Sequence, residues 1–110
     1  MRVRFVNQGS HPHTMHFHGW HMSEMDGSQA EHQVVPGGTF TYEFVADPFG
    51  LHLYHCHAVP LKRHIHKGMY GAFIVDPDPA RHPGEEAAAR SRLLGTPENG
   101  RWQEFVMVMN

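Results

Sequence analysis

A lone cysteine between two histidines constrains this chain more than any other feature. Cys56 is the only cysteine of the 110 residues, and His55 and His57 flank it. In an extended backbone successive side chains point to opposite faces, so both imidazoles would point one way and the thiol the other. His64 and Met69 follow at the end of the same loop. If this segment is extended, it can serve two metal sites at once.

The ligand types in this segment indicate copper. Two histidines, one cysteine and a long axial methionine form the blue-copper electron-transfer arrangement. A zinc site would more often show paired cysteines at short spacing, and the chain has none. The competing interpretation is a buried structural cysteine among surface histidines. The run HCH followed by HIHKGM makes such a chance arrangement a poor explanation.

A second histidine run, residues 11–21, supplies candidate ligands for both sites. His16 and His18 are two residues apart, so in a strand they share one face, and His13 has the opposite parity. This parity predicts that His13 joins Cys56, whereas the other two join the histidines beside the cysteine. The remaining histidines are not spaced so that they would join either group of ligands. We therefore expect surface or supporting roles for His11, His21, His32, His52, His66 and His82.

Three methionines and two acidic residues lie close to the second run. A methionine cluster could recruit Cu(I), but the irregular spacing favours gap-filling or exposure. The carboxylates could relay protons, and a solvated loop explains them equally well. These residues are Met15, Met22, Met25, Glu24 and Asp26.

Alternating apolar residues predict an all-β domain of short strands. Besides the two histidine segments, strands are expected at residues 2–6, 39–45 and 70–75. We expect this domain to span residues 1–79. Residues 80–100 indicate a linker or surface excursion with a short helix. Residues 101–110 indicate a strand leading towards a second domain outside this chain.

Composition argues against several function classes. The net charge of −2 offers no basic face for nucleic acid, and no apolar run is long enough to cross a bilayer. Histidine, the commonest metal ligand, occurs 12 times against 9 lysines and arginines. The N-terminus lacks the apolar core of a secretory signal, so the sequence alone leaves the compartment open.

Two motifs, HTMHFHG (His13 to Gly19) and HCHAVPLKRHIHKGM (His55 to Met69), resemble the copper signatures of the multicopper oxidase family. That family includes laccases, ceruloplasmin and two-domain bacterial copper oxidases. The resemblance covers residues 2–76 and is strongest to the first domain of two-domain, laccase-like enzymes. It implies a cupredoxin-like Greek-key β-sandwich, here without some N-terminal strands of the family, and a periplasmic or secreted protein.

The resemblance also implies a role for each motif residue, with copper as the cofactor. The type 1 copper ligands would be His13, Cys56, His64 and Met69, and the trinuclear cluster ligands would be His16, His18, His55 and His57. In the family a small-molecule or metal-ion donor reduces the type 1 copper, and the cluster reduces dioxygen to water. The chain carries half of the cluster histidines. The resemblance therefore implies a homotrimer in which a second cupredoxin domain completes the cluster.

Two alternatives stay open. A copper nitrite reductase shares the fold and the trimer, but the resemblance would then place a non-histidine residue after the cysteine and an acidic residue between the first two ligand histidines. Those positions are His57 and His16 here. A blue-copper electron carrier needs only the type 1 site and regains ground if the chain is complete. The sequence does not identify the reducing substrate.

Overall fold

The computed structural model describes residues 1–20, 24–84 and 106–109. The strands are β1 (Arg2–Val6), β2 (His16–Phe17), β3 (Thr39–Glu43), β4 (Gly50–His55) and β5 (Tyr70–Val75). A short 3-10 helix η1 (Ala30–His32) precedes β3, and helix α1 (Leu61–His66) lies between β4 and β5. Within the described ranges, no helix has the length and apolar character needed to span a membrane.

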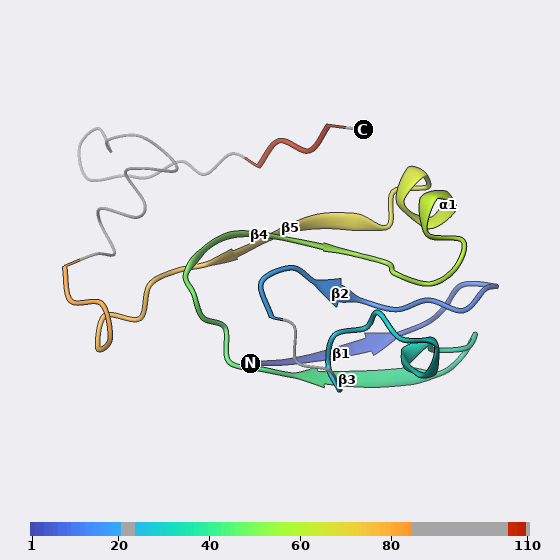
Figure 1. Ribbon diagram of the computed structural model, residues 1–110, viewed down its shortest axis with the longest axis horizontal. Coiled ribbons are helices and arrows are strands. Elements are labelled where there is room, and N and C mark those ends of the chain that lie inside the picture. The colour runs from blue at the N-terminus through green and yellow to red at the C-terminus, as the bar shows by residue number, and fades with distance from the viewer. Residues whose placement is uncertain (21–23, 85–105, 110) are drawn as a thin grey trace.

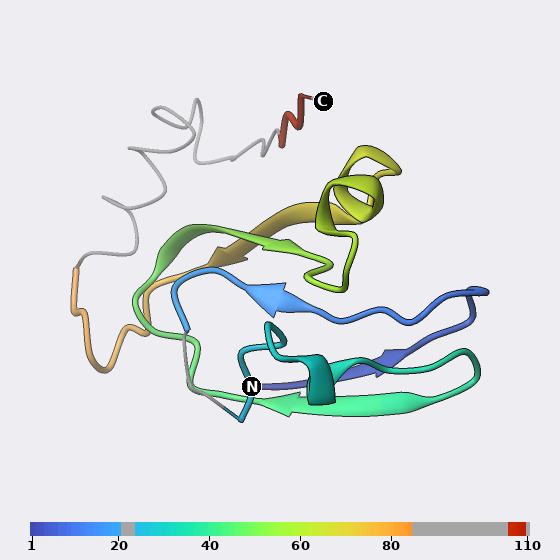
Figure 2. The ribbon, with the colours of Figure 1, turned by 45° about the vertical axis from the view of Figure 1, so that its right-hand side comes forward.

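The strands form two antiparallel sheets. β1 pairs with β3, and β4 lies between β2 and β5. Figures 1 and 2 show the two sheets as layers, with β1 and β3 in one and β4 and β5 in the other. The predicted all-β, sandwich-like architecture is confirmed, with open sheets and one short helix.

The core between the sheets is aromatic. It consists of Phe17, Trp20, Tyr42 and Phe44, all nearly or fully buried. The Phe17 ring lies between both sheets, with its centroid 5.6 Å from that of Tyr42 on β3 and 5.8 Å from that of Phe73 on β5. Aromatic pairs at this spacing stabilise the fold by more than the burial of their surface alone. This packing fixes β2 and therefore the histidines on either side of Phe17.

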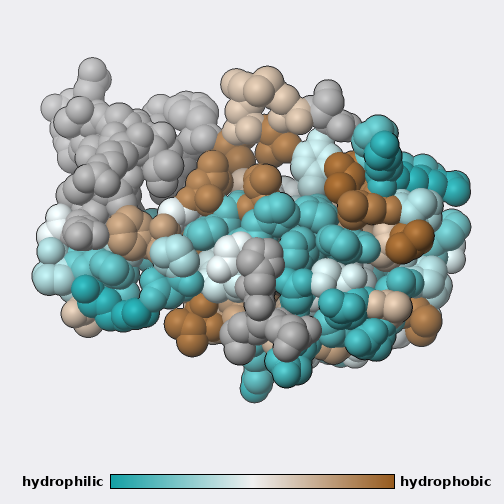
Figure 3. Space-filling view, viewed as in Figure 1, coloured by the Kyte–Doolittle hydropathy of each residue, from teal (hydrophilic) through white to brown (hydrophobic). Residues whose placement is uncertain are grey.

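The outer face of the larger sheet is apolar and exposed. Along β4, His52 and Tyr54 alternate with Leu51 and Leu53, which are 56% and 54% exposed. Ile74 of β5 pairs with Leu51 and adds to this face. In Figure 3 brown, hydrophobic residues gather over the part of the molecule where β4, β5 and α1 lie.

His64 lies on helix α1, whereas the sequence reading placed it at the end of a loop. Pro60 precedes the helix with an extended backbone, and Gly68 follows it at φ 91°. Proline at a helix start and glycine just past its end are ordinary boundary signals. The six-residue helix is too short to show a clear apolar period, which is why the motif concealed it.

The C-terminal expectations fall largely outside the described residues. Residues 80–84 form turns that pack on the domain, where Arg81 pairs with Asp47 at 2.6 Å. The rest of the predicted helical excursion, 85–100, is not described. Of the predicted strand over 101–110 only 106–109 is described; this part is exposed and pairs with none of the other described residues, so the strand stays a prediction. The domain boundary after residue 79 stays a prediction.

Candidate metal centre

The pairing of β2 with β4 brings the two histidine segments together. His16 lies opposite His55 in the antiparallel register, and the N–H of His18 donates to the carbonyl of Leu53 at 2.8 Å. A shift by one residue would move each of these side chains to the other face. The register therefore decides which histidines meet.

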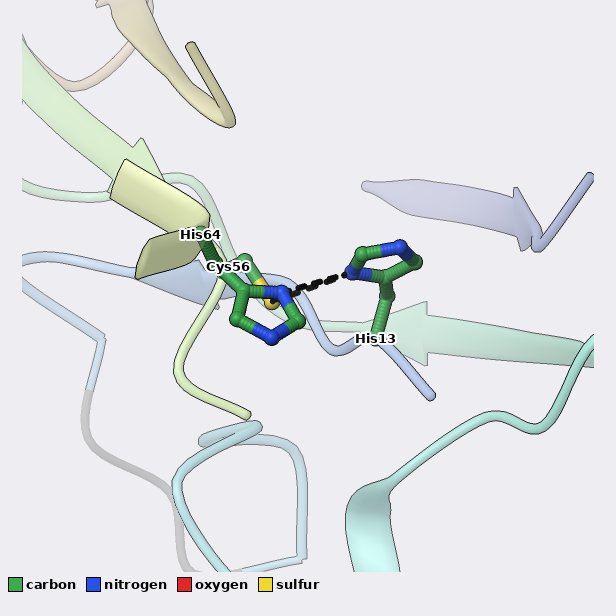
Figure 4. Close-up of side chains that lie close together, drawn as sticks. All are labelled: His13, Cys56 and His64. Carbon is green, nitrogen blue, oxygen red and sulfur yellow. Dashed lines mark hydrogen bonds between the residues drawn. The ribbon is translucent and has the colours of Figure 1, made fainter. Parts of the chain in front are cut away.

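Three side chains converge on the sulfur side. The Sγ of Cys56 lies 3.3 Å from Nδ1 of His64 and 3.6 Å from Nδ1 of His13. The two Nδ1 atoms are 2.9 Å apart. Figure 4 shows these side chains reaching one another from α1, the end of β4 and the segment after β1. Met69 lines the same hollow as both histidines. A buried sulfur and two imidazoles form the soft donor set that suits copper.

Backbone hydrogen bonds hold the cysteine in this position. The N–H of Cys56 donates to the carbonyl of Met69 at 2.9 Å, which closes the loop that carries α1. The N–H of Met69 in turn donates to the carbonyl of His64 at 3.1 Å. A further N–H, that of Thr14, points at the sulfur from 3.5 Å. This contact adds a third backbone group that holds the sulfur in place.

The histidines on the other side converge through Nε2 instead of Nδ1. The Nδ1–H of His55 donates to the carbonyl of Cys56 at 2.9 Å, so its Nε2 faces the other rings and lies 2.9 Å from Nε2 of His18. Ligand atoms of His16, His18 and His55 lie within 4.8 Å of one another. The ring centroid of His57 is 5.2 Å from that of His16. This group lies at the surface, since His18 is exposed.

A backbone carbonyl orients His16. Its Nδ1–H donates to the carbonyl of Asp26 at 2.6 Å, and the Asp26 carboxylate lies 3.3 Å away. The next residue, Gly27, has φ 69°, and a Cβ there would lie 2.1 Å from the carbonyl oxygen of Met15. Only glycine fits this approach. The hydrogen bond to the Asp26 carbonyl fixes the tautomer of His16 and directs its Nε2 towards the other imidazoles.

Thr14 connects the two sides and was not singled out from the sequence. It is fully buried, and besides the N–H near the sulfur it offers Oγ1 to the N–H of His57 at 2.9 Å. The only sequence signal was a small polar residue inside a run of ligands, HTMH. Thr14 thus contacts the sulfur of Cys56 through its backbone N–H and the backbone of His57 through its side chain.

We predict that Thr14→Val lowers the free energy of unfolding by about 1–3 kcal/mol, because it leaves the N–H of His57 without an acceptor. Thr14→Ser keeps the oxygen and should recover most of this loss. Urea unfolding of the copper-free chain measures both. A valine variant as stable as the wild type would contradict the assigned contact.

The pKa values of three of the clustered histidines are lowered from the ordinary histidine value. Burial lowers the pKa of His64, and the positive charges of His11, Arg63 and Lys67 lower it further. Burial is also the largest cause of the lowered pKa of His13, followed by its neighbours His64 and His11. For His16, burial outweighs the opposing effect of the Asp26 carbonyl and carboxylate. Neutral imidazole is the form that binds a metal.

We predict that the copper-free chain loses stability as the pH falls below about 6.5, the ordinary histidine pKa. Below that pH the unfolded chain binds protons that the folded chain resists, so protonation favours unfolding. Denaturant unfolding at pH 7.5, 6.5 and 5.5 measures how the free energy of unfolding changes with pH. The double variant H13Q/H64Q should make this dependence weaker. If the stability rose on acidification, folding would have to raise the pKa values of these histidines instead of lowering them.

The other described histidines have structural or surface positions. His52 packs on Trp20 at a centroid distance of 4.3 Å, as expected of a supporting residue. His32 is only 8% exposed, so it is no surface residue; it ends η1 and its Nδ1 accepts the N–H of Gln29. Exposed or half-exposed positions are taken by His11, His66 and His82. His21 lies outside the described residues.

The methionines and acids near the second run have separate places. Met15 packs against the aromatic core, as gap-filling predicts. Met25 is half-buried, Glu24 is exposed, and Asp26 orients His16. Met22 lies outside the described residues.

The open sandwich and its thiol-imidazole group define a cupredoxin domain with a copper-type donor set. The family model for multicopper oxidases matches residues 1–80, and the chain belongs to the multicopper oxidase family. The family implies copper as the cofactor, and the donor set described above fits it. Members of this family are copper oxidoreductases.

Relatives in the family carry different activities. A copper-containing nitrite reductase of Neisseria meningitidis is 38% identical over 79 residues, which cover 70% of this chain and 20% of the relative. An iron transport multicopper oxidase of Gibberella zeae is 36% identical over 74 residues, covering 63% of this chain and 11% of the relative. This chain thus spans a fifth or less of these relatives' length.

Solved structures show the same fold. The crystal structure of a multicopper oxidase shares 58% identity at a TM-score of 0.66, and the match covers 69% of this chain and 27% of that one. A blue copper oxidase from Nitrosomonas europaea shares 38% identity at a TM-score of 0.62, covering 74% of this chain and 28% of that one.

Proposed function

We propose that this chain is the electron-accepting domain of a laccase-like multicopper oxidase that couples oxidation of a reductant to reduction of dioxygen to water. The type 1 copper would be held by His13, Cys56, His64 and Met69. Half of the trinuclear cluster would be held by His16, His18, His55 and His57. Copper bound at these residues supplies one-electron redox chemistry and dioxygen reduction.

The observation that carries this proposal is the position of one short backbone segment between two groups of ligands. The sulfur of Cys56 faces two Nδ1 atoms, and the next residue back, His55, faces an Nε2 atom. Only the peptide between them separates the two groups. A rigid, covalent connection of this kind keeps both sites at a fixed distance and provides a short path for electrons.

The exposed side of the imidazole group supports an assembly in which another chain or domain completes it. His18 is exposed, and His55 and His57 are half-buried, so further ligands can approach from solvent. We propose a homotrimer in which a second cupredoxin domain of a neighbouring subunit supplies the remaining histidines, with export to the periplasm or the exterior.

A copper nitrite reductase is the second candidate, favoured by the 38% identity to the Neisseria enzyme. The convergence of His16, His18 and His55, with His57 close by, argues against it. The His16 ring centroid lies 5.2 Å from those of both His55 and His57, so neither His16 nor His57 is remote from the cluster. A mononuclear site would not require both.

Copper counting and acceptor assays separate these candidates. Assembled with the second domain that completes the cluster, an oxidase should hold more than one copper per subunit and consume oxygen when given a phenol, without reducing nitrite. A nitrite reductase would consume nitrite under anaerobic conditions. A carrier would hold one copper per chain and turn over neither acceptor, and either result would overturn the proposal.

A further inference from the structure

The imidazole group and the exposed apolar residues of β4 share one side of the larger sheet. Side chains two residues apart on a strand point to the same side of a sheet, and so do the side chains of paired residues. On β4 this side carries Leu51, Leu53 and His55, and the register places His16 beside His55. The aromatic core and the sheet of β1 and β3 lie on the opposite side (Figures 1 and 2). The clustered histidines and the leucines therefore form one continuous outer face.

This outer face is apolar and free of fixed charge. Leu51, Leu53 and Ile74 are 56%, 54% and 39% exposed. Lysine, arginine, aspartate and glutamate are all missing from the six outward positions of β4 and β5, which hold Leu51, Leu53, His55, Tyr70, Ala72 and Ile74. A second copy of the same face can therefore approach without the like-charge repulsion that a charged surface would cause.

The imidazole group gathers its ligand atoms at the surface of this face. The Nδ1 atoms of His16 and His55 bind backbone carbonyls, so their Nε2 atoms are directed towards the other rings. His18 is exposed, and its Nε2 lies 2.9 Å from that of His55. Copper bound at these atoms can accept further imidazoles from a molecule that covers the face. The group is therefore placed to be shared between two chains.

We propose that a second copy of this chain covers the outer face and that the two copies share one copper group, to which each contributes four histidines. The proposal rests on the proposed function, which assigns His16, His18, His55 and His57 to half of a copper cluster. The second copy would take the place that the proposed function gives to a second cupredoxin domain.

A two-fold axis that runs along β4, between the two faces, satisfies this arrangement. It would place the leucines of one copy opposite the leucines of the other, and one imidazole group opposite the other. Sheets that stack face to face lie about 10 Å apart, and side chains from both faces fill this space.

The association should depend on copper. Three apolar side chains per copy expose far less surface than the roughly 800 Å² that each partner buries in a stable interface. The copper-free chain should therefore remain a monomer. Copper held between histidines of two copies forms bonds that only the dimer can make, and a ligand that binds only the associated form shifts the equilibrium towards it.

Light scattering of the 110-residue chain after size-exclusion chromatography, with and without Cu(II), measures the association. We expect the mass of one chain without copper, and of two chains once copper exceeds the one ion held at the sulfur. H18Q should stay monomeric, because it removes an imidazole from the shared group. C56S should still dimerise, because the buried sulfur points away from the outer face. H66Q, which removes an exposed histidine of α1, should dimerise as the wild type does.

The variant L51K/L53K tests the face itself. Both leucines are more than half exposed, so lysine should be tolerated there, but it places like charges opposite each other across the two-fold axis. We expect the dissociation constant of the copper-bound dimer to rise at least about tenfold. The matched control V35K/V45K adds the same charge at exposed valines outside β4 and β5 and should leave the constant unchanged. An equal effect of both variants would overturn the assigned face.

Copper counting on the same fractions separates a failure of this proposal from a failure of the proposed function. Copper beyond the sulfur site in a chain that keeps the mass of one copy would overturn the shared group and leave the oxidase function standing. A dimer that survives both H18Q and L51K/L53K would show adventitious bridging by surface histidines and would also overturn the shared group. If the imidazole group takes up no copper with or without association, the proposed function fails together with the shared group.

Discussion

Cys56→Ser should abolish the intense visible absorption of the copper-loaded protein and lower its copper content by one ion per chain. The colour of a blue site comes from the bond between copper and thiolate, and Cys56 provides the only thiol. Serine keeps nearly the same volume at a fully buried position but cannot supply a thiolate. An absorption spectrum together with elemental analysis measures both effects.

The imidazole side provides the control. In H18Q the sulfur group is untouched, because His18 faces His55 and lies on the other side of the peptide. That variant should keep the colour and lose copper from the second group. A coloured serine variant, or a colourless H18Q variant, would show that the two groups are not separate sites.

Tyr42→Ala should lower the free energy of unfolding by about 3–5 kcal/mol, the loss usual for deleting a buried aromatic side chain. Tyr42 is fully buried and contacts Phe17 and Phe40, which carry the packing between the sheets. Its hydroxyl also accepts the N–H of Met15 at 2.9 Å, next to the histidine run. A loss of this size approaches the whole stability of a small domain.

Tyr42→Phe separates packing from hydrogen bonding. It keeps the ring and leaves the N–H of Met15 without its acceptor, so the expected loss is about 1–3 kcal/mol. Thr41→Ala, on the exposed face of the same strand, should change stability by less than about 0.5 kcal/mol. Chemical unfolding of the copper-free chain measures all three. Equal losses for Ala and Phe would contradict the packing role of the ring.

The alternation of side chains along an extended backbone accounts for the features of the fold and the site that could be predicted from the sequence. Alternation in residues 2–6 and 39–45 located β1 and β3 because one face of each is buried against the other sheet. The same two-residue period separated the sulfur of Cys56 from its neighbours and sorted His13 from His16 and His18. Each of these inferences needed only that the backbone be extended.

Features that depend on long-range contacts were not accessible in this way. The use of Nε2 by His55 and His16 follows from hydrogen bonds of their Nδ1 atoms to the carbonyls of Cys56 and Asp26, and no spacing in the sequence encodes it. Thr14 gained its role only through the approach of β4. Helix α1 was hidden because its six residues are dominated by the motif itself.

The most direct test is a crystal structure of the copper-loaded protein with anomalous scattering at the copper edge. One copper should lie in bonding contact with the sulfur of Cys56 and with Nδ1 of His13 and of His64. Separate copper should lie at Nε2 of His18 and His55, across the peptide. A single ion shared by both groups, or a copper bound without the sulfur, would contradict the two-site arrangement.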